Sequence, residues 1–134
     1  MEFEKHINLC YTTKKEDKRE GEEYMSTTAQ QSVIYIGLND SETGVQKYDT
    51  QKYLSILKNT CRSYKVAFSV QEIEGGYFHE DGRYTEEKTL KLKLVGVPEK
   101  TVDEIAKDFC VFFNQESIMV TSSPVSVFFV KETI

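Results

Sequence analysis

Tryptophan is absent from this sequence of 134 residues, and cysteine, histidine and long apolar runs are scarce. The three cysteines, Cys10, Cys61 and Cys110, are far apart and form no CxxC pair, so we expect neither a disulfide framework nor a zinc site. Cys61 and Cys110 fall on apolar helix faces and are interpreted as small buried hydrophobes. No stretch approaches the roughly 20 apolar residues that cross a bilayer, and no basic start followed by an apolar run marks a signal peptide. A cytoplasmic location is therefore expected.

The common nucleotide-binding and hydrolase motifs are missing as well. The sequence contains no GxGxxG, no GxxxxGK followed by Ser or Thr, and no GxSxG. Its net charge of −5 gives no general attraction to nucleic acid or to anionic membranes, so neither is expected as a partner. The only histidines, His6 and His79, do not make up a metal-binding set. We therefore expect no metal and no cofactor.

The residues that are present suit one soluble globular domain. Hydrophobic residues make up 39% of the chain and charged residues 29%, which is typical of a folded protein rather than a disordered one. Eight tyrosines and eight phenylalanines must fill much of the core. Residues 12–31 are polar without a lasting apolar period, which indicates a linker or a solvated helix, and alternation within residues 3–11 is compatible with one short strand. The sequence therefore predicts an N-terminal extension over residues 1–31 and a folded domain over residues 32–134.

From residue 32 onward, strand and helix patterns alternate. Strand patterns occupy residues 33–38, 66–71, 90–94 and 117–130. Ser122-Ser123-Pro124 divides the last of these into two short pieces. Helix patterns follow Asp49-Thr50 and the capping box at residues 101–104. This order is that of the ferredoxin-like fold, an α+β split βαββαβ arrangement in which two helices cover one face of an antiparallel sheet.

An extended, bent β-hairpin is predicted between the second and third strands. Asp81-Gly82 between two extended runs is a strong signal for a two-residue turn. The register that follows from this turn places the core residue Val70 opposite Lys93, and a slip of one residue is needed to bring Val70 opposite Leu92. We therefore expect a β-bulge at Gly75-Gly76 that absorbs the slip and bends the hairpin.

His79, Glu80 and Asp81 would lie at the tip of this hairpin. Because adjacent strand residues point to opposite faces, these side chains are not expected to converge on a substrate or a metal, and a solvated turn is predicted. Aromatic and carboxylate residues near the predicted bulge are better candidates for a ligand pocket, with ordinary cross-strand pairing as the alternative. The ligand-binding candidates are Tyr35, Tyr77, Tyr84 and Glu87.

Four segments of the domain resemble a known family. They are IYIGLN, FSVQEIEGGYF, DGRYTEEKTLKLKLVG and QESIMVTSSPVSVFFV, all within residues 33–130. The matching positions are Tyr35–Leu38, Gly76-Tyr77, Asp81–Arg83 with Glu87, and Gln115–Ser117 continuing through Pro124-Val125 to Phe128. On these motifs the chain is similar to an uncharacterised bacterial family, domain of unknown function 3574. The resemblance implies no established activity and no catalytic residue.

The first and last strands of the domain predict an assembly. Both are apolar on each side, so the sheet face away from the helices would expose an apolar patch larger than monomers usually tolerate. A second copy of the chain, or residues 3–11 folding back, would cover this patch, and we favour a homodimer packed through the open face. The interface candidates are Tyr35, Phe128 and Val130.

Two function classes are compatible with these patterns. The first is a binding or assembly module that acts as a homodimer, with a small molecule or a protein as its ligand. The alternative is a small dimeric enzyme of the α/β-barrel type, with a cavity between two facing sheets, that acts on an apolar or aromatic small molecule. The sequence favours the module, whereas a closed cavity lined by Tyr35, Tyr77 and Glu87 would favour the enzyme.

Overall fold

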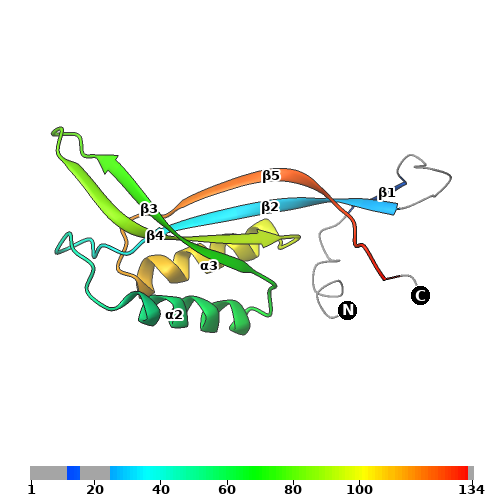
Figure 1. Ribbon diagram of the computed structural model, residues 1–134, viewed down its shortest axis with the longest axis horizontal. Coiled ribbons are helices and arrows are strands. Elements are labelled where there is room, and N and C mark those ends of the chain that lie inside the picture. Colours follow the sequence, from blue (N-terminus) through cyan, green and yellow to red (C-terminus); the bar gives the residue numbers. More distant parts are fainter. Residues whose placement is uncertain (1–11, 16–24, 133–134) are drawn as a thin grey trace.

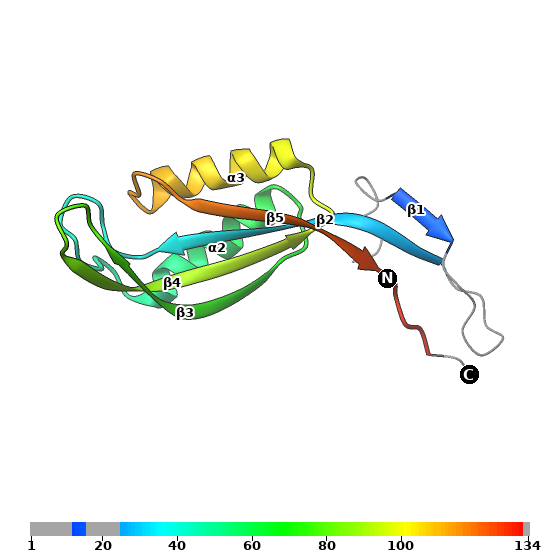
Figure 2. The ribbon, with the colours of Figure 1, turned by 90° about the horizontal axis from the view of Figure 1, so that it is seen from above.

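The computed structural model describes residues 12–15 and 25–132. The elements in chain order are β1 (Thr12–Lys15), β2 (Met25–Gly37), α2 (Thr50–Ser63), β3 (Ser69–Phe78), β4 (Tyr84–Val95), α3 (Glu99–Phe112) and β5 (Met119–Val127). Figures 1 and 2 show both helices on one face of a long, twisted sheet. The helices have 14 residues each, and neither is long and apolar enough to cross a membrane.

The sheet is antiparallel at each of its strand pairs. β4 pairs with β2 on one side and with β3 on the other, and β5 pairs with the opposite edge of β2. The four main strands therefore have the order β5-β2-β4-β3, with both helices on one side. This arrangement confirms the predicted α+β, ferredoxin-like fold class.

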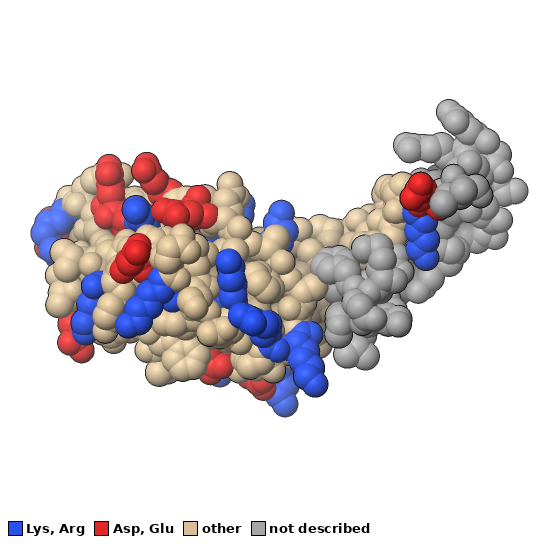
Figure 3. Space-filling view, turned by 60° about the horizontal axis from the view of Figure 1, so that its bottom comes forward, with Lys and Arg blue, Asp and Glu red and all other residues tan. Residues whose placement is uncertain are grey.

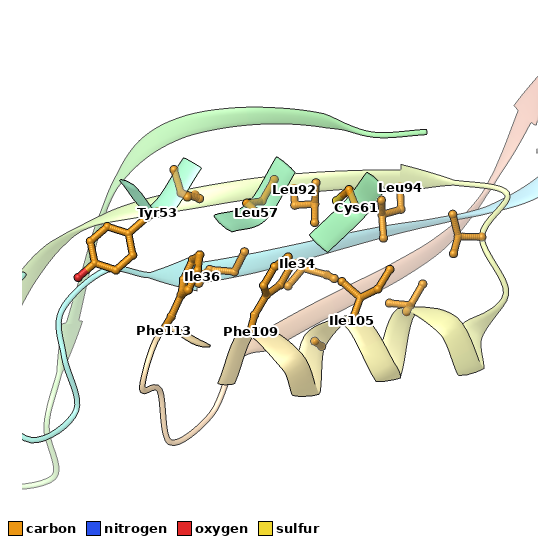
Figure 4. Close-up of a cluster of buried hydrophobic side chains, with 14 of the residues drawn as sticks. Ile34, Ile36, Tyr53, Leu57, Cys61, Leu92, Leu94, Ile105, Phe109 and Phe113 are labelled. Carbon is orange, nitrogen blue, oxygen red and sulfur yellow. The ribbon is translucent and has the colours of Figure 1, made fainter. Parts of the chain in front are cut away.

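The core lies between the sheet and the two helices. Alternate residues of β2 and β4 point toward the helices because side chains change face at each step along a strand. Figure 4 shows Phe109 of α3, and Phe113 directly after this helix, beside these residues. The Phe113 ring meets that of Tyr53 of α2 edge-on, at 5.2 Å between centroids. The fully buried side chains of the core are Ile34, Ile36, Leu38, Leu57, Cys61, Leu90, Leu92, Leu94, Ile105 and Phe109.

Cys61 belongs to this core. It is fully buried, and burial raises the pKa of its thiol to about 11. This confirms the interpretation of Cys61 as a small hydrophobe, whereas Cys110 is only half-buried.

β2 crosses the boundary that the sequence predicts at residue 31. The strand begins at Met25, and residues 12–15 form β1, so neither stretch is the predicted linker or solvated helix. Residues 25–31 are mostly polar, yet β1 and β5 pair with them from opposite sides, and the pairing satisfies their backbone hydrogen-bonding groups. The β2–β5 ribbon continues past the helices as an arm, which we define as residues 25–30 and 124–127 (Figure 1). The predicted strand within residues 3–11 lies outside the described residues.

Two other boundaries differ from the predicted ones. β5 is one strand that passes through Ser122-Ser123-Pro124, and Pro124 pairs with Gln30 of β2. Proline is tolerated in an edge strand because its missing N–H can face away from the neighbouring strand. α3 begins at Glu99, directly after Pro98, so Thr101 lies inside the first turn and does not cap the helix.

The β3–β4 hairpin has a longer turn than predicted and no bulge at its glycines. The His79 N–H donates to the Arg83 carbonyl at 2.8 Å, the Gly82 N–H donates to the His79 carbonyl at 2.9 Å, and Gly82 has φ of 90°. These bonds enclose a three-residue loop with glycine at the left-handed position. Pairing then runs unbroken from Phe78↔Tyr84 to Val70↔Leu92. The pairing of Val70 with Leu92 is confirmed, and the predicted bulge at Gly75-Gly76 is wrong because the turn itself contains the extra residue.

Candidate functional site

A cleft of about 730 Å³ lies at the end of the sheet from which the hairpin projects. Its walls come from three parts of the chain: the β3–β4 hairpin with the end of β2, the β2–α2 loop, and the α3–β5 loop. The strand and hairpin residues that line it are Tyr35, Gly37, Ile73, Gly75, Gly76, Tyr77, His79, Glu87, Thr89 and Met119. The loop residues that line it are Asn39, Asp40, Ser41, Gly44, Gln115, Glu116 and Ser117.

Three of the four predicted ligand-binding residues meet in this cleft. Tyr35, Tyr77 and Glu87 come from three different strands and line the same space. Tyr84 points to the other face of the hairpin, where it lines a smaller hollow of about 350 Å³ with Glu74 and Glu86. The cause is the register, because Tyr84 pairs with Phe78 and therefore alternates out of phase with Glu87.

The Glu87 carboxylate is held at the inner end of the cleft. Its Oε2 accepts a hydrogen bond from the backbone N–H of Asn39 at 3.0 Å, and the residue is half-buried. The carboxylate occupies the space in front of Gly37, where the Cβ of any other residue would overlap it. Glycine at position 37 therefore permits the close approach of this acid to β2.

Hydrogen bonds join the two loops that face the hairpin. The Asp40 carboxylate accepts the side-chain amide of Asn114 at 3.0 Å and the Glu42 N–H at 2.9 Å. These bonds, the one from Asn114 first, lower the pKa of the Asp40 carboxyl below its usual value. The Gln115 side-chain amide donates to the Asn39 carbonyl at 2.5 Å. The β2–α2 loop is thereby fixed against the end of α3.

Sequence reasoning missed the roles of these loop residues. The predicted ligand-binding residues do not include Asn39, Asp40, Gln115 or Glu116, although the last two belong to the Gln115–Ser117 motif. That motif was the one available signal, because loop residues have no periodicity that would show which way they face.

His79 does not lie at a solvated tip. The residue is half-buried and lines the cleft, and its Nε2 lies 2.8 Å from the Thr85 hydroxyl. Its ring also lies 5.0 Å from that of Tyr77, between centroids. The prediction of a solvated imidazole is corrected, because the three-residue turn begins after His79 and keeps that residue beside β4.

The cleft combines carboxylates with aromatic rings. Asp40, Glu87 and Glu116 line it, and none of its described lining residues is lysine or arginine. Acidic side chains gather toward the upper left of Figure 3, at the hairpin end of the molecule. Among the described residues, no group of three or more His, Cys, Asp or Glu side chains could hold a metal ion. The cleft is therefore suited to an organic ligand that carries positive charge and a flat apolar part.

Fold and cleft together define a ferredoxin-like α+β domain with an acidic, tyrosine-lined cleft at one end of its sheet. No protein-family model and no curated protein matches the chain. The resemblance to domain of unknown function 3574 therefore stays a prediction.

Two solved structures are similar to this chain. A phage SAM lyase in complex with S-methyl-5'-thioadenosine aligns with a TM-score of 0.53 and 17% identity, over 74% of this chain and 88% of that one. A phage SAM lyase in the apo state aligns with a TM-score of 0.54 and 13% identity, over 79% and 94% of the two chains. At these identities the likeness shows a shared fold.

Proposed function

We propose that this protein is a cytoplasmic enzyme of the SAM lyase type, which binds S-adenosylmethionine (SAM) in the acidic cleft and releases S-methyl-5'-thioadenosine. One observation carries the proposal: the chain shares the fold of a phage SAM lyase over most of both lengths, and it has a cleft that is lined by carboxylates and tyrosines. The enzyme alternative is thereby favoured over the binding module.

The cleft suits SAM in size and in the types of group it presents. Its volume of about 730 Å³ lies within the usual range of small-molecule sites, about 300–1,000 Å³. Tyr35 and Tyr77 offer aromatic surface to a flat adenine ring. Glu87 and Glu116 offer negative charge to the sulfonium, which follows the ribose, and to the ammonium group at the end of the molecule away from adenine.

The negative charge of the cleft favours binding of the substrate over binding of the product. SAM carries a positive sulfonium, whereas S-methyl-5'-thioadenosine is a neutral thioether. When the carbon–sulfur bond breaks, its electron pair goes to sulfur and the sulfonium charge disappears. A lyase consumes no water, so the new bond to the carbon that loses sulfur comes from within the substrate: its carboxylate oxygen attacks that carbon, and the amino-acid part leaves as a lactone. The attraction to the cleft carboxylates is then lost, which promotes product release.

The test is direct incubation of the purified protein with SAM. Chromatography should detect S-methyl-5'-thioadenosine, formed in proportion to enzyme concentration. Glu87→Gln keeps the size of the side chain and removes its charge, and it should raise the KM for SAM about tenfold, because the contact to the positive charge is made in the bound substrate.

Glu86→Gln is the matched control. Glu86 is the neighbouring acid on β4, but it faces the smaller hollow on the other side of the hairpin. The control variant should keep the native KM for SAM. Absence of both product and SAM binding in the native protein, with the fold intact, would overturn the proposal.

We further propose that the enzyme works as a homodimer packed through the open sheet face. Met119 at the edge of the cleft is 59% exposed, and Phe128 and Val130 beyond β5 are 56% and 86% exposed. A second copy packed against these side chains would remove their apolar surface from water. A second copy across this face would also cover the rim of the cleft around Tyr35.

A further inference from the structure

The backbone of Asn39 lies between two walls of the cleft and forms a hydrogen bond with a residue of each wall. Its N–H donates to Glu87 Oε2 at 3.0 Å, and its carbonyl accepts from Gln115 Nε2 at 2.5 Å. Its side-chain amide also donates to the Glu86 carbonyl at 3.4 Å. The α3–β5 loop therefore fixes this residue from one side, and Asn39 in turn fixes the Glu87 carboxylate on the other.

Gly37 provides the space in which the Glu87 side chain lies. It pairs with Thr89 at the end of the β2–β4 ladder, two residues before Asn39. The Glu87 side chain folds over Gly37 into a space that the Cβ of an alanine would occupy. The carboxylate can receive the Asn39 N–H only while that space is free.

We propose that Gln115 and Gly37 are positioning residues, which hold the Glu87 carboxylate in the cleft before a ligand arrives. The catalytic part of this inference rests on the proposed function. The positioning of Glu87 rests on the geometry alone. A mobile glutamate side chain loses conformational entropy when a ligand binds to it, which weakens binding. A side chain that is already held in place avoids this loss, so the ligand binds more tightly. The Gln115–Ser117 segment then has two roles: Gln115 positions Glu87 through Asn39, while Glu116 and Ser117 line the cleft.

The first test measures positioning without any ligand. An amide proton that donates to a carboxylate shifts when that carboxylate is protonated, so the Asn39 amide resonance should follow the titration of Glu87 in two-dimensional NMR. Gly37→Ala should abolish this shift, because the new methyl group displaces the carboxylate. Gln115→Leu should reduce the shift, because the Asn39 carbonyl loses its donor.

Gln30→Leu is the control for the loss of a glutamine. The Gln30 side chain donates to the Ser122 hydroxyl at 2.7 Å, far from the cleft on the β2–β5 ribbon. This variant should keep the native Asn39 titration. If Gly37→Ala folds and its Asn39 amide still titrates with Glu87 as in the native protein, the inference fails.

The second test measures SAM affinity by calorimetry. Gly37→Ala and Gln115→Leu should each weaken binding about tenfold, whereas neither should weaken it further in a Glu87→Ala background, because coupled residues are not additive. Additive losses in that background would overturn the positioning role. If the native protein does not bind SAM while the Asn39 titration behaves as expected, the proposed function fails and the positioning role is supported.

Discussion

Asp40 is a nearly buried carboxylate whose charge depends on its hydrogen bonds. It is only 8% exposed, and it accepts from the Asn114 side chain and from the backbone N–H groups of Glu42 and Thr43. A buried charge is costly unless such donors satisfy it. The ionised Asp40 side chain therefore links the β2–α2 loop to the end of α3.

Asp40→Asn should destabilise the protein near neutral pH and have progressively less effect in acid. The pKa of the folded carboxyl is lowered, chiefly by Asn114, so the ionised group contributes stability above the usual aspartate value of about 3.9. That contribution is lost as the pH falls through the folded pKa. Urea unfolding of both proteins from pH 7 to pH 3 checks this, and a difference that stays constant across the range would contradict it.

Only some of the residues in the cleft could be predicted from the sequence. Tyr35, Tyr77 and Glu87 could, because they lie on strands whose facing follows from alternation. Gln115 could not be linked to Asn39, because 76 positions separate them and both lie in loops. Such contacts depend on how α3 ends and where the next strand begins, and no local pattern encodes that geometry.

At the scale of elements, the hairpin shows how a correct pairing can follow from a wrong turn. Asp81-Gly82 suits a two-residue turn, but it suits a three-residue loop equally, since glycine takes the left-handed position in both. The hydrophobic pattern predicts Val70 opposite Leu92 correctly, but the extra residue lies in the turn and not at Gly75-Gly76. Burial of one face determines register more reliably than turn sequence does.

Gly75→Val should destabilise the protein more than Gly76→Val. A Cβ at Gly75 lies 2.9 Å from the hydroxyl of Thr89, which is buried, so crowding there should cost about 1–3 kcal/mol. A Cβ at Gly76 overlaps the hydroxyl end of Tyr84, which is exposed and can turn away. Valine also suits a strand better than glycine does, so the second change should be nearly neutral.

Urea midpoints of the two variants measure this difference. Neither glycine has a positive φ, so conformational strain does not enter. Equal losses of stability in the two variants, or a larger loss for Gly76→Val, would show that crowding against Thr89 does not destabilise the hairpin.

At the scale of the whole molecule, the order of elements was the most predictable property. Each helix and main strand has its own apolar period, and a split βαββαβ order leaves few ways to bury all of these faces at once. The arm was not predictable, because residues 25–30 are mostly polar and lack an apolar period, and they form a strand through pairing with β1 and β5.

Phe128→Glu should yield monomers or insoluble protein. Phe128 follows β5, more than half of its surface is exposed, and a carboxylate placed in an apolar interface would be desolvated without a partner. Sedimentation equilibrium of native and variant protein at micromolar concentration measures the change. Val111→Glu is the control, since Val111 is also exposed but lies on α3, away from the open sheet face.

A native chain that sediments as a monomer at these concentrations would contradict the homodimer. A variant that remains a dimer would instead show that the interface lies elsewhere on the molecule.

The hairpin and the arm project from opposite ends of the body, and both helices lie along the same long axis (Figure 1). A molecule of this shape experiences more friction than a sphere of equal mass, so a single copy would leave a gel-filtration column ahead of compact proteins of its size. It would also tumble faster about its long axis than end over end. Helix N–H bonds point along that axis and strand N–H bonds point across it, so the two classes of amide would relax at different rates in solution.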